Sequence, residues 1–324
     1  MTDAKIVFSD EKVKHTARIA RLSKHKRAKQ RLLKYIKKTS TSLTPSQIDR
    51  YTDCHSYLVF KNYFTLNKIK LSHAEHCDIH LLCPLCAIRR AAKKVQAYGK
   101  KVEDLVTENP SFRLFYVVLT VLNKSHLSTA YKNLTSGQKV LMQRRREAQS
   151  FLKTGNEKHR AAANSLFAKV AAGAYSIEVK RGKNSKLWHP HTNFVLLTQY
   201  DIDQKELARE WKEITGDSHN VFCKEIIITE DEGRAERIKD VMLEIFKYAM
   251  KFSEMKNSDM IHAWEMLKKR RLTGSFGLFR GLDTEAEVEE SDQAEFEEIF
   301  YRFIDYEYRQ FERSGKTELK GVHQ

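Results

Sequence analysis

The chain has 324 residues, and 58 Lys and Arg against 42 Asp and Glu leave a formal net charge of +16. A chain of this length can bury a full core, and this charge favours polyanionic partners, nucleic acid first and an anionic membrane surface second. No apolar run is long enough to cross a bilayer, and Met1 to Asp10 lacks the basic-then-apolar order of a signal peptide. We therefore expect a cytoplasmic protein without a membrane partner.

The first segment, residues 1–45, contains a strongly basic run at 11–38 with few helix breakers. A thin apolar stripe at roughly helical spacing is formed by Ile19, Leu22, Leu32, Leu33 and Ile36. The pattern predicts a basic helix, and we expect that helix to contact the DNA backbone. The alternative is an ordinary solvated helix.

Residues 46–110 form a cysteine-rich region, predicted to bind both zinc and DNA. Three cysteines lie in a C-x5-C-x2-C pattern and one precedes them; the set is Cys54, Cys77, Cys83 and Cys86. Two thiolates at C-x2-C spacing can hold one ion across a tight turn, and Zn²⁺ prefers four tetrahedral ligands. We expect a structural Zn²⁺ here, with Cys54 as the first choice for the fourth ligand. The alternative fourth ligands are His55, His73, His76 and His80.

Two further interpretations of the cysteines stay open. They could be buried free thiols, or the C-x2-C pair could serve thiol exchange. Disulfides are disfavoured in a reducing compartment. Cys223, the fifth cysteine, lies far along the chain in another expected strand, and we expect it to take no part.

Two basic groups are candidates for DNA contact. Arg89 and Arg90 directly follow the cysteines on an expected helix, which a bound metal would brace. The segment 264–282 is basic and punctuated by glycine, and is expected to be a helix followed by a turn against DNA. Its candidate residues are Lys269, Arg270 and Arg271.

Residues 111–282 alternate between strand-like and helix-like patterns, which predicts an α+β fold with a sheet covered by helices. The strands are recognised by β-branched and aromatic runs and the helices by apolar residues at helical spacing. The expected strands are 114–123, 175–180, 188–197 and 222–229. The expected helices are 125–173, 204–214 and 234–253.

The strand at 188–197 carries the candidate ligands of a second metal ion. Side chains alternate across a strand, so His189, His191 and Asn193 share one face. A hairpin through 181–186 would bring Glu178 beside that face. Pro190 lacks a ladder donor and suits the start of a strand or a sheet edge. The alternative is an exposed histidine pair and an ordinary outward-facing glutamate.

The helix at 234–253 carries a candidate nucleophile. Glu244 and Tyr248 are four residues apart and share a face, and Lys247 and Lys251 lie beside them. A tyrosine with a carboxylate one turn back and a cation one turn on can act as a nucleophile. Its ordinary pKa is about 10, so cations and a metal-polarised phosphate would have to assist the attack. The alternative is an amphipathic helix with a polar outer face.

The last segment, 283–324, is acidic and rich in aromatic residues. We expect an amphipathic helical tail. Such a tail could pack on the core, bind a second subunit, or mask basic surface.

Taken in order, these blocks resemble the rolling-circle plasmid replication initiators of the HUH endonuclease group, in the branch with a cysteine-rich block before the catalytic motifs. The resemblance runs from about residue 50 to 282. FYVVLTVLN at 115–123 resembles the first motif, F-x-T-L-T-x-x-N, and WHPHTNFVLL at 188–197 the second, H-P-H-F-H-V-L-L. EIFKYAMKFS at 244–253 resembles the third, whose nucleophilic Tyr is followed by Lys three residues later and, in this branch, preceded by Glu four residues earlier.

Two flanking blocks extend the resemblance, and two positions depart from it. CDIHLLCPLCAIRRAAK at 77–93 is similar to the cysteine block, DCHSYLVF contains its upstream cysteine, and WEMLKKRRLTGSFGLFRGL resembles the basic ending. The second histidine of the family's pair is replaced by Asn193, and the first threonine of the first motif by Val118. An Asn carbonyl can bind a hard cation, and His189 on the same face could substitute.

The resemblance implies an HUH-like antiparallel sheet with flanking helices and a metal-dependent nickase. His191, with His189 or Asn193 and with Glu178, would hold Mg²⁺ or Mn²⁺. Tyr248 would cut one strand of a plasmid origin, leaving a 5′-phosphotyrosine link and a 3′-OH primer. Glu244 would activate water for termination, and Lys251 would contact phosphate.

The implied partners are origin DNA, both duplex and single-stranded, and a host polymerase and helicase in a bacterial cytoplasm; a homodimer is left open. Two alternatives remain. One is a zinc-braced DNA-binding regulator with an inactive nuclease site, which the change at Asn193 favours. The other is an HUH relaxase or transposase that acts on a different DNA.

Overall fold

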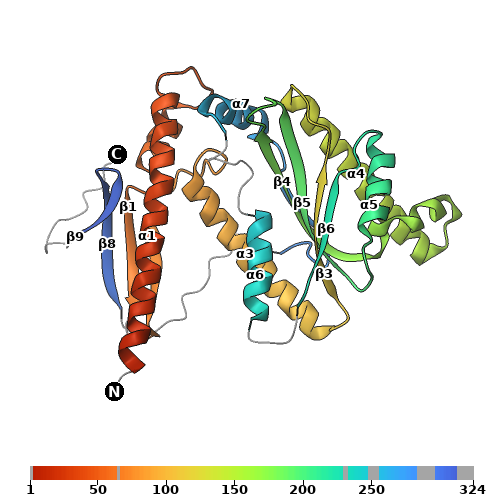
Figure 1. Ribbon diagram of the computed structural model, residues 1–324, viewed down its shortest axis with the longest axis horizontal. Coiled ribbons are helices and arrows are strands. Elements are labelled where there is room, and N and C mark those ends of the chain that lie inside the picture. The colour runs from red at the N-terminus through yellow and green to blue at the C-terminus, as the bar shows by residue number, and fades with distance from the viewer. Residues whose placement is uncertain (1–2, 64–65, 229–232, 247–254, 283–295, 312–324) are drawn as a thin grey trace. The chain divides into compact units, whose positions relative to one another are not determined.

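The computed structural model describes residues 3–63, 66–228, 233–246, 255–282 and 296–311, with side chains from residue 11 on. The chain forms two compact units (Figure 1). Unit 1 comprises Met1–Cys86 and Glu287–Gln324, and unit 2 comprises Ala87–Ala286. Unit 1 therefore takes its residues from both ends of the chain.

Unit 1 is a four-stranded antiparallel sheet with two helices. The sheet order is β2-β1-β8-β9. Its strands are β1 (Tyr57–Tyr63), β2 (Lys68–Ala74), β8 (Glu297–Ile304) and β9 (Glu307–Phe311). Its helices are α1 (Asp3–Ile36) and α2 (Pro45–Asp53), and α2 begins with a capping box between Thr44 and Gln47.

The basic helix expected near the N-terminus is confirmed as α1, and it packs on this sheet. Ile19 and Leu22 lie against the core formed by β1, β2, β8 and β9. The ring of His15 is hydrogen-bonded to the Tyr301 hydroxyl at 3.0 Å. The inward face also holds two lysines, Lys26 and Lys29, which are 3% and 1% exposed.

The helical tail expected at 283–324 is wrong over 297–311, where the structure has strands β8 and β9. Tyr301 and Tyr308 point into the unit 1 core, while most of their neighbours are exposed, which is the alternation of a strand. β1 supplies the partner, since its residues Tyr57–Asn62 pair with β8. Residues 283–295 and 312–324 lie outside the described residues.

Unit 2 is a five-stranded antiparallel sheet in the order β6-β3-β5-β4-β7, which confirms the α+β class. The strands are β3 (Arg113–Thr120), β4 (Val170–Arg181), β5 (Trp188–Thr198), β6 (Val221–Ile226) and β7 (Thr273–Gly277). The helix expected over 125–173 ends at Thr154 and is followed by two 3-10 turns. β4 then starts at Val170, five residues earlier than the strand expected from residue 175. β7 pairs with β4 where a turn was expected.

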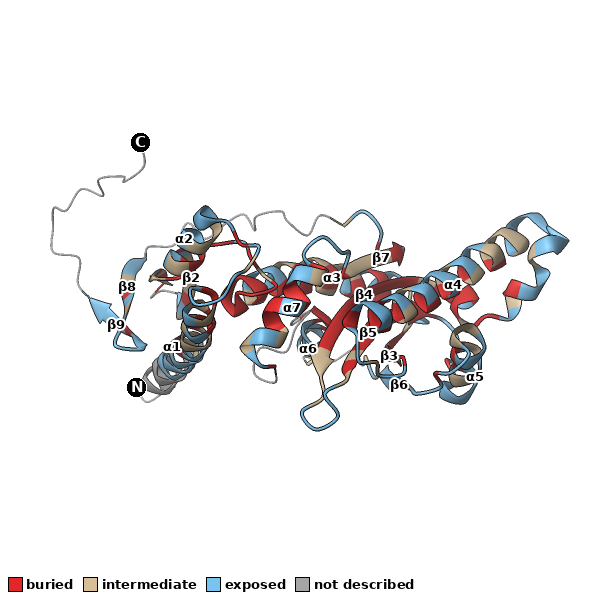
Figure 2. Ribbon diagram, turned by 90° about the horizontal axis from the view of Figure 1, so that it is seen from above, coloured by how far each residue is buried: buried red, intermediate tan, exposed pale blue. Residues whose placement is uncertain are grey.

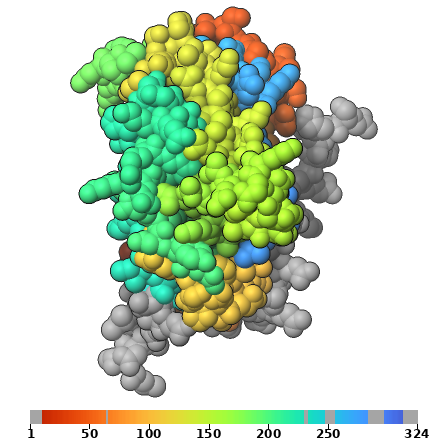
Figure 3. Space-filling model, turned by 90° about the vertical axis from the view of Figure 1, so that its right-hand side faces the viewer, coloured from red at the N-terminus to blue at the C-terminus, as the bar shows by residue number. Residues whose placement is uncertain are grey.

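Helices cover both faces of this sheet (Figure 1). One face carries α4 (Leu127–Thr154) and α5 (Gln204–Thr215), with the 3-10 turns η2 (Glu157–Asn164) and η3 (Leu166–Lys169) beside α4. The other carries α6 (Arg234–Phe246) and α3 (Pro84–Glu108), of which the stretch from Ala87 on belongs to unit 2. α7 (Asn257–Leu267) precedes β7. Figure 3 shows one side of the molecule, where the yellow-green and teal stretches of the chain that include α4 and α5 form much of the surface.

Strands β4 and β5 are buried almost throughout (Figure 2). Thr192 on one face of β5 donates to Gln138 of α4, and Val195 on the other face packs among residues of α3 and α6. Polar residues on β5 are therefore enclosed by helices. None of the helices among the described residues is long and apolar enough to span a membrane.

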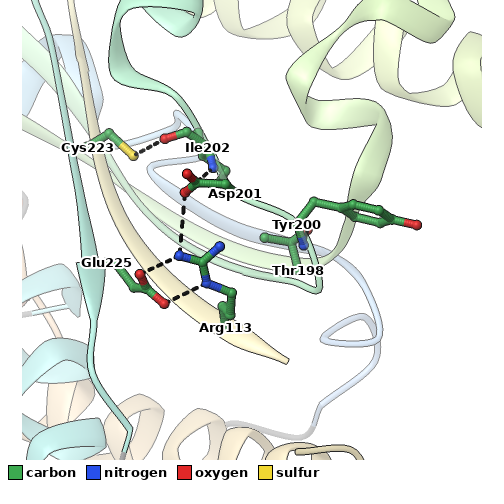
Figure 4. A network of polar contacts seen from close by, with 7 residues as sticks. All are labelled: Arg113, Thr198, Tyr200, Asp201, Ile202, Cys223 and Glu225. Atoms are coloured by element: carbon green, nitrogen blue, oxygen red, sulfur yellow. Dashed lines mark hydrogen bonds and ion pairs between the residues drawn. The ribbon is translucent and has the colours of Figure 1, made fainter. Parts of the chain in front are cut away.

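An exposed ion pair joins β3 to β6 at the start of β3 (Figure 4). Arg113 donates through Nε and Nη2 to the two carboxylate oxygens of Glu225, at 2.7 and 2.5 Å, and its Nη2 is 3.5 Å from Asp201. These hydrogen bonds lower the pKa of Glu225 from its ordinary value. The pair therefore adds a solvent-exposed side-chain contact between the two strands.

Candidate metal centres

The four predicted zinc ligands come together in unit 1. Cys54 follows α2, Cys77 follows β2, and Cys83 and Cys86 flank the start of α3. All four Sγ atoms lie within 4.8 Å of one another. The Sγ atom of Cys86 is 3.6 Å from those of Cys54 and Cys77, and Cys54 is 3.7 Å from Cys83. A tetrahedron with Zn–S bonds of about 2.3 Å has edges of this length.

The backbone turns sharply beside two of these ligands. His55 follows Cys54 with φ of 59°, and Asp78 follows Cys77 with φ of 57°. Non-glycine residues adopt this region at a cost of about 1 kcal/mol, and they do so mainly where a site requires it. The backbone N–H of His55 donates to the Glu75 carbonyl at 2.9 Å, which ties the two ligand-bearing loops together.

Ionisation within the cluster needs a cation. Hydrogen bonds from Cys77, Cys83 and Cys86 hold the pKa of the Cys54 thiol well below its usual range. Burial and its neighbours raise the pKa of Cys83. Four thiolates cannot coexist in a buried site without a positive centre. A divalent ion supplies one, and a closed set of four sulfurs is the donor set of structural zinc.

Two histidines of the alternative ligand set lie beside the thiols. The Nδ1 atom of His55 is 3.1 Å from the Sγ of Cys54, and His55, His76 and Cys86 form a second group of potential ligands within 4.8 Å. The buried Nδ1 of His76 has no hydrogen-bond partner among the described residues. His73 and His80 belong to no such group within the same described ranges. Cys223 lies on β6, in unit 2, as expected.

The histidine strand in unit 2 has the register predicted from the hairpin. Glu178 on β4 pairs directly with His191 on β5, and their Oε2 and Nε2 atoms are 3.4 Å apart. Both side chains are buried, and the Nδ1 of His191 has no hydrogen-bond partner among the described residues. Two ligands of a common ion can have this separation. Among the described residues, no third histidine, cysteine or carboxylate ligand atom completes a group within 4.8 Å of them, as it does at the cysteine cluster.

Pro190 was expected at the start of a strand or at a sheet edge, and it lies near the start of β5, which is the central strand of the sheet. It is tolerated because it stands near the start of β5. The last residue of β3, Thr120, pairs with His191, and the ladder between these two strands begins only after Pro190.

Asn193 is held by a residue that the sequence reasoning missed. The Tyr116 hydroxyl on β3 donates to the Asn193 Oδ1 at 2.9 Å. Burial, followed by the charges of Glu244 and Glu178, raises the pKa of Tyr116 to about 12. The Tyr116 hydroxyl therefore stays protonated near pH 7 and acts as the hydrogen-bond donor to Asn193. The only sequence signal was its place two residues before Val118, on the same face of the first motif.

His189 is oriented by Asn123, the last residue of the first motif, through a hydrogen bond between Nδ1 and Oδ1. Its ring lies 5.6 Å from that of His191. Burial lowers the pKa of His189 to about 4, and the neighbouring His191 and Lys180 act in the same direction. The imidazole is therefore neutral near pH 7 and able to bind a metal.

Helix α6 lies over this face, and the Ser176 hydroxyl of β4 donates to the Ile245 carbonyl. Glu244 is exposed on α6. The predicted nucleophile Tyr248 and its neighbours Lys247 and Lys251 lie outside the described residues. The basic residues predicted to bind DNA are all exposed: Arg89 and Arg90 on α3, and Lys269, Arg270 and Arg271 between α7 and β7.

Comparison with known proteins places the chain in a family. The model of a family described as "Replication protein" matches residues 68–310, which is more than half of the chain. A "Protein rep" of Streptococcus pneumoniae is 22% identical over 226 residues, covering 65% of this chain and 63% of that protein. A "Protein rep" of Staphylococcus aureus is 22% identical over 205 residues, covering 60% of this chain and 80% of that protein. No solved structure matches.

The four-cysteine block and the antiparallel sheet agree with the family resemblance seen in the motifs. The chain belongs to the replication protein family.

Proposed function

We propose that the chain initiates rolling-circle replication of a plasmid by nicking one strand of the origin through Tyr248. The observation that carries the proposal is the pairing of Glu178 with His191, beside Asn193 and beneath helix α6. The last described residue of that helix, Phe246, directly precedes Lys247 and Tyr248 in the sequence. The relatives named above are replication proteins, which supports the same general role.

The residues on this face fit a hard divalent cation. His191 and Glu178 would hold Mg²⁺ or Mn²⁺, with the Asn193 carbonyl or the neutral His189 as a further ligand. When bound, such an ion would neutralise the charge that develops on the scissile phosphate.

The other residues act on the strand itself. The Tyr248 oxygen would attack the phosphate in line, forming the 5′-phosphotyrosine link and releasing the 3′-OH that a host polymerase extends. Lys251 would contact phosphate. Glu244, which is exposed on α6, would accept a proton from water when the displaced strand is released. The exposed arginines and lysines on α3 and after α7 would bind the duplex backbone while a host helicase opens it.

The test is a labelled single-stranded origin oligonucleotide with Mg²⁺ or Mn²⁺, resolved on a denaturing gel. Tyr248→Phe should bind the DNA and form no covalent adduct. Tyr116→Phe, a matched change on the same face, should still form one. Glu244→Ala should form the adduct but release the strand poorly. A persistent adduct in Tyr248→Phe would assign the attack to another residue.

A second function, DNA binding without nicking, is favoured by one observation. Asn193 replaces the family's histidine, and its Oδ1 already accepts a hydrogen bond from Tyr116. Under this function the wild-type chain binds origin DNA and forms no adduct with either metal. If Asn193→His then forms the adduct, the asparagine at this position alone accounts for the missing nicking activity.

A further inference from the structure

Helix α1 buries two lysine side chains that neither the family resemblance nor the proposed nicking uses. The Nζ atoms of Lys26 and Lys29 converge on one oxygen, the backbone carbonyl of the zinc-ligand candidate Cys54, at 2.6 and 3.0 Å. Transfer of an ammonium group from water into a protein interior costs several kcal/mol unless a negative charge compensates it. Two such groups side by side also repel each other. Two lysines that keep their charge at these buried positions therefore need a negative centre nearby.

The other contacts of these lysines supply dipoles but no charge. Lys26 also donates to the Ser56 hydroxyl at 3.2 Å, Lys29 donates to the Thr52 carbonyl at 3.3 Å, and Lys29 lies over the Tyr51 ring. Within the described residues, no carboxylate forms an ion pair with either Nζ. Burial and the neighbouring Lys29 lower the pKa of Lys26 to about 7, and the thiols of Cys54 and Cys83 oppose that shift.

Formal charge then selects the composition of the site. Four thiolates around a divalent ion leave two negative charges, which two lysines neutralise. Three thiolates and one neutral histidine would leave a single negative charge and one lysine without compensation. The two lysines therefore favour the four-cysteine set. On this count His55 and His76 are not metal ligands. They lie beside the thiolates, where their ring N–H groups can donate hydrogen bonds to sulfur.

We propose that Lys26 and Lys29 are the counter-cations of a metal tetrathiolate at the cysteine cluster, so that the metal and helix α1 stabilise each other. This inference rests on the proposed zinc site. α1 presents other cations, among them Arg21, Lys24 and Arg31, on its exposed side. Loss of the metal would leave two buried charges without a partner and release the helix. The outer basic face would then lose the fixed position from which it can contact DNA.

The first experiment measures Zn²⁺ affinity of the full chain by competition with a chromophoric chelator. Lys26→Met and Lys29→Met keep much of the side-chain length and remove the charge. Each should weaken Zn²⁺ binding about tenfold, and the double variant more. The matched control is the double variant Lys24→Met, Lys38→Met, which removes two exposed charges and should change affinity less than twofold. Unchanged affinity in the Lys26, Lys29 double variant overturns the proposal.

The second experiment needs no lysine variant. The chain is loaded with Co²⁺, whose visible spectrum reports how many thiolates bind it, in wild type and in His55→Ala and His76→Ala. Four thiolates in all three proteins are expected. Three thiolates and an imidazole in wild type would leave one negative charge and overturn the charge balance while leaving the metal site intact. A chain that binds neither Zn²⁺ nor Co²⁺ would remove the zinc site and this inference together.

The third measurement is hydrogen exchange of α1 before and after chelation. Wild type should lose amide protection in residues 20–36 by tenfold or more when the metal is removed, whereas β4 and β5 of unit 2 should be unaffected. In the Lys26→Met, Lys29→Met variant the loss in α1 should be smaller, because no buried charge is exposed by chelation. Equal losses in the two proteins would contradict the coupling.

Discussion

The cysteine cluster of unit 1 and the histidine strand of unit 2 are both candidate metal centres, yet they are built differently. The cluster gathers four identical soft ligands from three separate segments, buried and at tetrahedral spacing. The second site offers nitrogen and oxygen ligands from β5 and from the adjacent strand β4. Two of these side chains are hydrogen-bonded to residues that are not candidate ligands. Asn193 accepts from Tyr116, and His189 is bonded to Asn123.

The difference agrees with the role that we propose for each site. A structural site is closed and carries its own charge compensation, so its removal should unfold the surroundings. A catalytic site keeps positions open for substrate, and its ligands are oriented by second partners such as Asn123 and Tyr116. Metal removal should therefore affect stability in unit 1 and activity in unit 2. Four sets of substitutions test this division.

The largest effect is expected from Cys83→Ser. Cys83 is fully buried, and the change removes one thiolate from the closed set. Structural zinc contributes about 10 kcal/mol of apparent folding free energy, so loss of bound zinc and of the thermal transition of unit 1 should follow. Elemental analysis and differential scanning calorimetry measure both. Cys223→Ser is the control and should keep the metal. A Cys83→Ser protein with undiminished zinc would contradict a closed site of four cysteine ligands.

A large effect on activity with little effect on stability is expected from His191→Ala. The variant loses the imidazole that faces Glu178, and nicking of the origin oligonucleotide should fall about 100-fold or more. Affinity for duplex origin DNA should stay nearly constant, because backbone contacts elsewhere dominate it. Gel-based nicking and filter binding give the two readouts. His219→Ala, at an exposed position, is the control, and equal losses in both variants would point to unfolding instead.

Smaller changes are expected at the Asn193–Tyr116 pair. Asn193→His restores the ligand of the resembling family and should keep or raise the nicking rate. Tyr116→Phe removes one hydrogen bond, worth about 1 kcal/mol, and should alter the rate by less than about tenfold. Rates are measured with Mg²⁺ and Mn²⁺ separately. An inactive but folded Asn193→His protein would make His189 the partner of His191.

The smallest effect is expected from Glu225→Gln, which serves as a metal-free reference. The Arg113–Glu225 pair is more than one third exposed on both sides, so its contribution is below about 1 kcal/mol after screening. The folded pKa of Glu225 is lower than its ordinary value of 4.5. The stabilisation is therefore complete above the unfolded pKa and is lost as the pH falls through the folded value.

Thermal unfolding of wild type and Glu225→Gln between pH 3 and 7 measures this contribution. The difference between the two proteins should be present at pH 7 and vanish at the acid end, and chelator should not change it. A chelator-dependent difference would mean that this end of the sheet is coupled to a metal after all.

Local pattern was enough for much of both sites. The alternation in 188–197 predicted one face for His189, His191 and Asn193, and the hairpin length predicted that Glu178 would join them. The cysteine spacing predicted a common ion for Cys77, Cys83 and Cys86. These features depend on neighbours a few residues apart, or on the side-chain period of one strand, and that information lies in the sequence itself.

Other features were decided by the tertiary structure. The acidic tail became β8 and β9 because β1 offers it a partner more than 200 residues earlier, and strand pairing over such a distance leaves no local signature. Tyr116 acquired its role only when β3 paired with β5 and placed its hydroxyl on Asn193. Lys26 and Lys29 look like any solvated lysines in a basic helix. They are buried because the cysteine cluster provides the charge that a lysine needs in order to leave water, and only the fold brings the two together.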